Sequence, residues 1–332
     1  MKPIRQLLLL GLLVSLLLVV KLGCISVNSS SYNEARFKTT QSLSVASAAA
    51  IVVRTHNGSV NIRHGEAAET SIVATLSASS QKRLDQMHVV TKQQAGGILL
   101  VTIDYPAQKS GEWEGCSFDI TVPAVTQSTK VDSSNGAILL ESVDGPAVLE
   151  TSNAVVEVRH HSGPVNVRTS NGAVIVSDVK GPATLTTSNA VMRITDETGN
   201  VHASTSNGAV VLQQVTGEID AHTSNATMEL MQVCGRTSAQ TSNGSIAFSP
   251  AANSPEPFDL HTSNATMSLK LPSSYAGRLA LETSNSVIHY AGMSGVHDVS
   301  GDKNHVVMNI GNDTRESTAQ TSNGAIELQF GD

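Results

Sequence analysis

Apolar and polar residues alternate along most of the chain, and the alternation returns with an 18-residue period. In the cycle that begins with Asn171, the apolar residues Val174 and Val176 would share one face of a short strand. A glycine follows ten positions after the asparagine in six cycles, and a second alternating stretch comes next, with Val165 and Val167 as its apolar pair in one cycle. Each repeat is therefore predicted to form a strand, a glycine turn, a second strand and a Ser-Asn turn.

An asparagine marks the same turn in every cycle. It keeps the 18-residue spacing up to Asn243, and the intervals from there to Asn323 are slightly longer. A fixed period is the sequence signature of a repeat architecture. If the repeats stack, the asparagine amides can hydrogen-bond along the stack as a ladder. The asparagines predicted to form this structural ladder are Asn135, Asn153, Asn171, Asn189, Asn207, Asn225, Asn243, Asn264, Asn285 and Asn323.

Two architectures could use such a unit. Asn-Gly pairs are favoured in two-residue hairpins, which would give an antiparallel meander. Alternate cycles, however, carry Asn-Ala, and alanine tolerates the positive φ of that turn poorly. A parallel β-solenoid, in which identical residues stack in neighbouring coils, explains the pattern better. The sequence therefore predicts an all-β fold, a parallel right-handed β-helix of 18-residue repeats over residues 131–332.

A slower rhythm lies over the 18-residue period. The residue after the asparagine alternates between glycine and alanine, and the residue four positions after it alternates between apolar and polar types. If like residues stack on like, residues 36 apart are neighbours and each coil contains two repeats. Asn171 would then lie closer to Asn207 than to Asn189. Two outward ladders would follow, one charged (Glu157, Arg193, Glu229) and one apolar (Leu139, Ile175, Val211, Ala247).

The N-terminal residues indicate export. Residues 1–23 contain Lys2, Arg5 and an apolar run from residue 7 to residue 20, which is short for a membrane span. The Leu-Gly-Cys sequence that ends at Cys24 resembles a bacterial lipoprotein signal, although Lys21 stands where that signal has an apolar residue. Lipidation at Cys24, an ordinary cleaved signal and an uncleaved anchor all remain open.

Two further regions precede the repeats. Residues 24–46 are rich in Ser and Asn and are predicted to be a flexible tether. Residues 47–130 contain strand-like alternation and an Asn-Gly turn at Asn57, without the 18-residue period. They are predicted to form a less regular N-terminal β cap.

Composition limits the kind of core and the kind of partner. Apolar residues make up 40% of the chain but aromatic residues only 3%, so the core must consist of small and branched aliphatic side chains in thin layers. The formal net charge is −7 and basic clusters are lacking, which argues against a nucleic-acid partner. Three cysteines fit neither a disulfide framework nor a paired metal site.

Several motifs together resemble a known group. They are the Asn-Gly-Ser-Val-Asn-Ile-Arg segment at 57–63, the Tyr-Pro pair at 105–106, the Val-Pro step at 122–123 and the tandem Thr-Ser-Asn-Gly repeats. Over residues 45–332 the chain resembles the bacterial "toastrack" or putative-adhesin family. The resemblance implies an exported, right-handed β-helix-like domain at the cell envelope that acts in adhesion or in sensing envelope stress. It supplies no catalytic residues.

Candidate chemistry is sparse. The pair His160 and His161 is the densest histidine cluster, but adjacent residues on a strand point to opposite faces and cannot chelate one ion. The acids are spread one per coil, and the chain lacks a nucleophile elbow, a P-loop and a dinucleotide fingerprint. We therefore expect no catalytic residues, no metal and no cofactor.

These observations predict a non-enzymatic binding, adhesion or scaffolding module of the cell envelope, tethered to a membrane in the periplasm or at the cell surface. Its expected partner is an envelope or surface protein or a glycan. The alternatives are a sensory or structural envelope domain and a carbohydrate-active β-helix enzyme.

Overall fold

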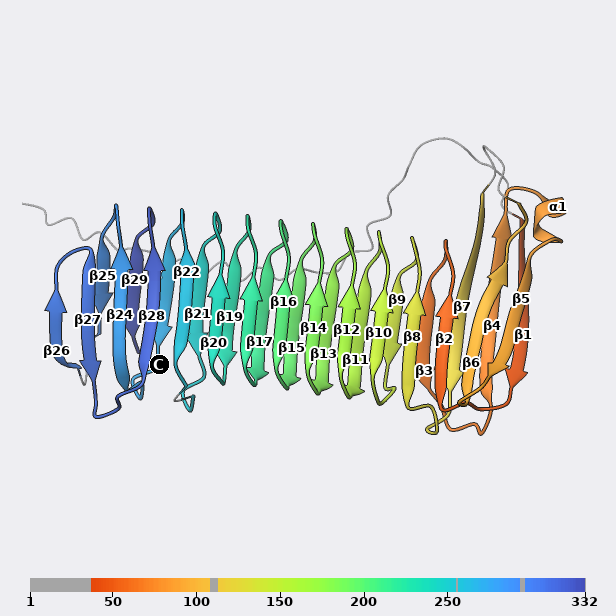
Figure 1. The fold of residues 1–332 in the computed structure, drawn as a ribbon, viewed down its shortest axis with the longest axis horizontal. Helices are drawn as coiled ribbons and strands as arrows, with labels where there is room; N and C mark the ends of the chain where they lie inside the picture. The colour runs from red at the N-terminus through yellow and green to blue at the C-terminus, as the bar shows by residue number, and fades with distance from the viewer. Residues whose placement is uncertain (1–36, 108–112, 255, 293–295, 332) are drawn as a thin grey trace, which may run out of the picture. The chain divides into compact units, whose positions relative to one another are not determined.

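The computed structural model describes residues 37–107, 113–254, 256–292 and 296–331 (Figure 1). All of them belong to the second of two units, residues 35–332, and the first unit, residues 1–34, lies outside the described residues. The predicted signal sequence and Cys24 therefore lie outside them too.

Each repeat forms one coil with two strands, as the alternation predicts. In the coil that starts at Asn171, strand β13 (Val174–Lys180) is followed by a glycine turn and then by strand β14 (Ala183–Thr186). Val174 and Val176 are fully buried, and so is Leu185 on β14. Ile175, between the two valines, faces outward and is half-buried. Inward valines, leucines and isoleucines from successive coils fill the space between the two strand columns.

The first strands of the coils form one sheet, which we call sheet A. Its fourteen strands within the described residues lie in the spatial order β1 (Phe37–Val45), β4 (Thr70–Ala78), β7 (Glu114–Val122), β3 (Val60–His64), β9 (Ile138–Glu141), β11 (Val156–Ser162), β13, β15 (Met192–Thr198), β17 (Val210–Thr216), β19 (Met228–Val233), β21 (Ile246–Pro250), β23 (Met267–Leu271), β29 (Ile326–Phe330) and β25 (Ile288–Ala291).

The second strands form sheet B. Its fifteen strands within the same residues lie in the order β26 (Val296–Gly301), β27 (His305–Ile310), β24 (Gly277–Thr283), β28 (Glu316–Thr321), β22 (Phe258–Thr262), β20 (Thr237–Gln240), β18 (Ile219–His222), β16 (Val201–Ser204), β14, β12 (Val165–Arg168), β10 (Ala147–Glu150), β8 (Ser128–Asp132), β2 (Ala50–Arg54), β6 (Ile98–Asp104) and β5 (His88–Gln94). The predicted all-β parallel solenoid is confirmed.

The coil length predicted from the slower rhythm is wrong. Strand β13 pairs in parallel with β11 and β15, with Val174 opposite Val156 on one side and Met192 on the other. Each of these partners comes from the adjacent 18-residue repeat, so one repeat makes one coil. Asn171 hydrogen-bonds directly to Asn189 and not to Asn207.

Steric conflict at the asparagine turn explains the 36-residue rhythm. A Cβ on Gly172 would lie 1.6 Å from the carbonyl oxygen of Ala154 in the preceding coil, and the corresponding distance at Gly208 is 1.7 Å from Ala190. A turn that stacks on an alanine turn must therefore lack a side chain at this position. Glycine and alanine turns alternate between neighbouring coils. Two coils of 18 residues therefore separate one glycine turn from the next, which gives the 36-residue period.

The predicted outward ladders change accordingly. Ile175 lies between Glu157 and Arg193 on the neighbouring strands, so apolar and charged side chains alternate from coil to coil. The charged residues are two coils apart, about 10 Å, which is too far for ion pairs. Glu157 pairs instead with Arg159 on its own strand, through an Nη2–Oε1 contact of 2.5 Å.

The N-terminal region continues the stack. The coil formed by β2 and β3 lies between the first repeat (β8, β9) and a coil formed by β6 and β7. At this end β1 pairs antiparallel with β4, β4 with β7, and β5 with β6, and helix α1 (Gln81–Leu84) packs on β1 and β4. Strand β1 occupies residues 37–45, which the sequence placed in a flexible tether, so that boundary was wrong. Alternating residues there, rich in Ser and Thr, supply an edge strand.

The C-terminal end shows a similar insertion. The last coil of the chain, β28 and β29, lies between the coil of β22 and β23 and the coil of β24 and β25 (Figure 1). Strands β26 and β27 pair antiparallel beside β24. Sequence order and spatial order therefore differ at both ends of the stack.

Candidate functional site

The asparagine side chains form a continuous hydrogen-bonded row. Each amide nitrogen donates to the side-chain oxygen of the asparagine in the preceding coil, as Asn189 does to Asn171 over 2.7 Å. The ten bonds of the row measure between 2.6 and 2.9 Å. In spatial order it runs through Asn57, Asn135, Asn153, Asn171, Asn189, Asn207, Asn225, Asn243, Asn264, Asn323 and Asn285.

The structure thus brings together all ten predicted ladder residues and adds one. Asn57 begins the row and donates to the carbonyl oxygen of Glu114. Its Asn-Gly turn was visible in the sequence, but it lies outside the 18-residue spacing. Asn304, which stands 19 residues after Asn285 and 19 before Asn323 in the sequence, lies between β26 and β27 and donates instead to the carbonyl oxygen of Ser284. Because each amide donates to one neighbour and accepts from the other, the row links the turns of successive coils and stabilises them.

Replacing one ladder residue should cost little stability. Asn189→Ala removes the bond to Asn171 and the bond accepted from Asn207 over 2.9 Å. Both are exposed, so we expect a loss of about 1 kcal/mol in the free energy of unfolding. Asn166→Ala, at an exposed outward position of β12, is the matched control. Thermal melts that coincide for the two variants would contradict a stabilising ladder.

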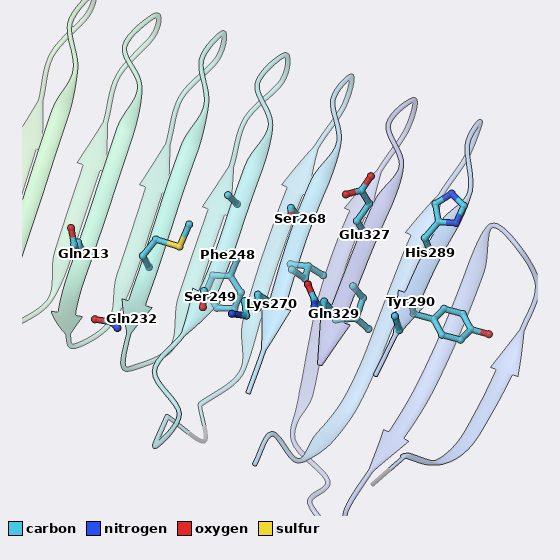
Figure 2. Close-up of a pocket in the computed structure, with 15 residues that line it drawn as sticks. Gln213, Gln232, Phe248, Ser249, Ser268, Lys270, His289, Tyr290, Glu327 and Gln329 are labelled. Atoms are coloured by element: carbon cyan, nitrogen blue, oxygen red, sulfur yellow. The ribbon is translucent and has the colours of Figure 1, made fainter. Parts of the chain in front are cut away.

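A groove of about 700 Å³ crosses the outward face of sheet A near the C-terminal end of the stack (Figure 2). We call it the sheet A groove. Strands β17, β19, β21, β23, β29 and β25 contribute to it. The residues that line it are Gln213, Met231, Gln232, Ala247, Phe248, Ser249, Ser268, Leu269, Lys270, His289, Tyr290, Ala291, Glu327, Leu328 and Gln329.

Short outward side chains make this hollow. Ala247 on β21 and Ser268 on β23 occupy the outward column in which other coils carry Ile175, Arg193 or Glu229, and Ser249 on β21 lies opposite Met231 in the next outward column. Phe248, Leu269 and Leu328 point into the core and are 3% exposed or less, so they contribute only backbone to the floor. Met231, 38% exposed, lies opposite Ser249 on the strand at one side of the floor, and Glu327 lies opposite Ser268 on the strand at the other side.

Polar groups around the floor are available to a ligand. Lys270, Glu327 and His289 are exposed, and none of them takes part in an ion pair within the part of the chain that the structure describes. Glu327 lies opposite Ser268 on one neighbouring strand and opposite His289 on the other. Lys270 lies opposite Gln329. The groove therefore presents amide, ammonium, imidazole and carboxylate groups above an uncharged floor.

The histidines do not converge. His160 faces outward and its Nδ1 lies 2.7 Å from Asp178, whereas His161 is buried in the core. His202 and His222 both contact Asp220, at 2.9 and 2.7 Å. Among the residues with described coordinates, no group of three or more His, Cys, Asp or Glu side chains is arranged to hold a metal ion.

The sequence analysis did not predict that two polar residues of the repeats, His161 and Glu197, are buried in the core. His161 and Glu197 are each 1% exposed, and their side-chain nitrogens and oxygens have no hydrogen-bond partner. Burial raises the pKa of Glu197 to about 8 and lowers the pKa of His161 below its usual value. A signal existed in the six cycles that begin at Asn135 to Asn225: the position eight places after the asparagine is valine in four of them, for example Val179 and Val215, and it is His161 or Glu197 in the other two.

Within the described residues, no helix has both the length and the apolar character needed to cross a membrane. Cys116 is buried and Cys234 half-buried, and both are free thiols.

The chain is similar to several solved bacterial structures, all at low sequence identity. A "putative adhesin" from Bacteroides fragilis matches at 15% identity and a TM-score of 0.35, over 88% of this chain and 97% of the other. A "putative lipid binding protein" from Parabacteroides distasonis matches at 13% identity and a TM-score of 0.35, over 88% and 96%. A "putative cell adhesion protein" from Clostridium sporogenes matches at 9% identity and a TM-score of 0.22, over 89% and 99%.

No protein-family model matches the chain, and no curated protein does. The adhesin names agree with the family resemblance noted from the sequence. At these identities and TM-scores the matches carry no argument about function, which must come from the groove and its side chains.

Proposed function

We propose that the chain is an exported binding module of the cell envelope that holds its ligand in the sheet A groove. The observation that carries this proposal is the groove itself, a concave, uncharged floor ringed by polar side chains that make no ion pairs with the described residues. Concave sites with a few convergent polar groups are where proteins bind ligands. Export rests on the N-terminal sequence, and attachment through a lipid at Cys24 remains part of the proposal.

Binding is favoured over hydrolysis at this site. Glycoside hydrolases use a pair of carboxylates on either side of the scissile bond. Glu327 is the one carboxylate among the described residues that line the groove. A groove with a single carboxylate can hold a polymer without cleaving it. Gln213, Gln329 and Lys270 then serve as hydrogen-bond donors that orient the ligand.

Filling the groove should abolish binding. In Ser249→Trp, an indole would occupy the floor on β21, and we expect retention of the exported protein on immobilised cell-envelope fragments to fall at least about 10-fold. Such a fall corresponds to about 1.4 kcal/mol of binding free energy. Ser177→Trp is the matched control, because Ser177 occupies the same outward column of sheet A on β13, outside the groove.

Equal retention of the two tryptophan variants would show that the groove is not the binding site. Release of soluble fragments from the envelope material, abolished by Glu327→Gln, would instead favour the enzymatic alternative.

A further inference from the structure

The floor of the sheet A groove is closed to strand addition. Extended peptides often bind by adding a strand to an open sheet edge, where main-chain groups are unpaired. Strands β19, β21, β23 and β29, which form most of the floor, each pair with a neighbour on both sides. The main-chain groups of these four strands are therefore already used, and over them only side chains remain to recognise a ligand. Strand β25, at the end of the groove, is the edge strand of the sheet and pairs only with β29.

The groove also lacks what a protein anchor or an acyl chain requires. Binding hot spots are large apolar or aromatic residues in desolvated pockets. Met231 is an exposed apolar side chain at the floor, but Ala247, Ser249 and Ser268 around it are small and leave the hollow open to solvent (Figure 2). Tyr290 is 40% exposed, and its ring points away from the floor toward the end of the stack.

The polar side chains match a ligand rich in hydroxyl groups. Gln213 and Gln329 each supply a carbonyl oxygen and an NH2 group, so each can donate to one hydroxyl and accept from another. Lys270 donates and Glu327 accepts, and their opposite charges leave the groove without a strong preference for an anion or a cation. This mixed set of donors and acceptors suits sugar hydroxyls better than it suits phosphate or a charged peptide.

The direction of the groove favours a polymer. It crosses the sheet from β17 to β25, which are five strand spacings apart, or about 24 Å. A chain of sugar rings lying along the stack would meet one strand after another, and each strand would present one or two side chains to it. A single small sugar would contact only a fraction of these residues.

From these observations we infer that the ligand of the sheet A groove is an extended, largely neutral glycan that lies across strands β17 to β25. This inference rests on the proposed function and names the class of ligand that the same groove takes. Its hydroxyl groups exchange hydrogen bonds with Gln213, Lys270, His289, Glu327 and Gln329 above a floor of small side chains, and Glu327 acts there as an acceptor. Loss of one contact should weaken binding in steps, because the contacts are spread along the polymer.

The test uses the exported protein on three immobilised probes: an array of neutral, acidic and amino-sugar oligosaccharides, an array of unstructured peptides, and vesicles of phosphatidylethanolamine and phosphatidylglycerol. We expect the protein to be retained on neutral oligosaccharides, and its retention should increase with the number of sugar units in the oligosaccharide. Gln329→Leu, which keeps the size of the side chain and removes its hydrogen bonds, should weaken this retention about 5-fold to 10-fold. Ser249→Trp should abolish it, and Ser177→Trp should leave it unchanged.

The outcomes separate the two proposals. If peptides or vesicles are retained instead, and Ser249→Trp abolishes that retention, the glycan inference is overturned while the groove stands as the binding site. If glycans are retained equally by Ser249→Trp and Ser177→Trp, both the groove and the inference fail. Retention on no probe overturns the glycan inference.

Discussion

Gly172→Ala should be among the most destabilising single substitutions in the stack, although it adds one methyl group. The new Cβ would lie 1.6 Å from the carbonyl oxygen of Ala154 and 2.3 Å from its carbonyl carbon. Both atoms are backbone, and each coil is hydrogen-bonded to its neighbours, so neither turn can move away without breaking the parallel register. We expect a loss of about 3 kcal/mol or more, seen as a fall of several degrees in Tm.

Ala190→Gly is the matched control for this substitution. It changes the same turn position in the next coil, where the residue after the asparagine is alanine and not glycine. Removing that methyl group creates no clash and should cost about 0.5 to 1 kcal/mol through backbone entropy. If Gly172→Ala melts at the same temperature as Ala190→Gly, the turns relax freely, and steric stacking does not explain the alternation.

The repeated coil could be read from the sequence, whereas its length could not. Strand positions follow from local alternation: Val174 and Val176 are buried because period-two burial needs no knowledge of distant residues. The asparagine row also follows, because residues separated by one coil length stack on one another in a solenoid and the asparagine occurs in every coil of the repeats. The 36-residue coil was a wrong inference from the glycine–alanine alternation. That alternation comes from a contact between Gly172 and the backbone of another coil, and like residues need not stack on like.

The order of the strands at the ends of the stack, and the groove that depends on it, could not be predicted from the sequence for a different reason. Glu327 and Gln329 reach the groove because β29 lies between β23 and β25, which precede it in the chain. Their nearest groove neighbours on β23 are Ser268 and Lys270, and the chain forms strands β24 to β28 before it returns to them. No local pattern specifies such an insertion. The short side chains of the floor were visible in the sequence, but nothing there showed which long side chains would surround them.

Glu197→Val should have the largest stabilising effect. Glu197 is 1% exposed, lacks a hydrogen-bond partner and lies in a column in which its pairing partners on the two neighbouring strands are Val179 and Val215. Its pKa is raised from 4.5 to about 8, so the folded chain keeps this carboxyl protonated at pH 7. Each unit of that shift is worth about 1.4 kcal/mol. Replacing Glu197 by valine should therefore raise the free energy of unfolding by about 3 kcal/mol at pH 7.

The pH dependence distinguishes this cause from better packing. Because the folded pKa of Glu197 lies above its unfolded value of 4.5, the native state has its full stability below pH 4.5 and loses it as the pH rises toward about 8. The advantage of Glu197→Val should thus grow between pH 4.5 and 8 and then level off. Glu197→Gln is the control, since it cannot ionise but still buries a polar group. It should remove the pH slope and recover less stability than valine does.

His161 lies in the same column of the core as Glu197, and its effect on stability depends on pH in the opposite direction. Burial lowers its pKa, although the backbone of Val143, the carboxylate of Asp144 and the backbone of Gly145 partly oppose the shift. The imidazole is therefore neutral in the folded state, and the stability that depends on it is lost as the pH falls below about 6.5, where the unfolded imidazole gains a proton. His161→Val should stabilise the chain most at low pH, whereas Glu197→Val should do so most at high pH. Denaturant unfolding of both variants and the parent between pH 4 and 9 would measure these opposite pH dependences. Two parallel profiles, each a constant distance from that of the parent, would mean that neither buried group titrates in the folded chain and that valine acts through packing alone.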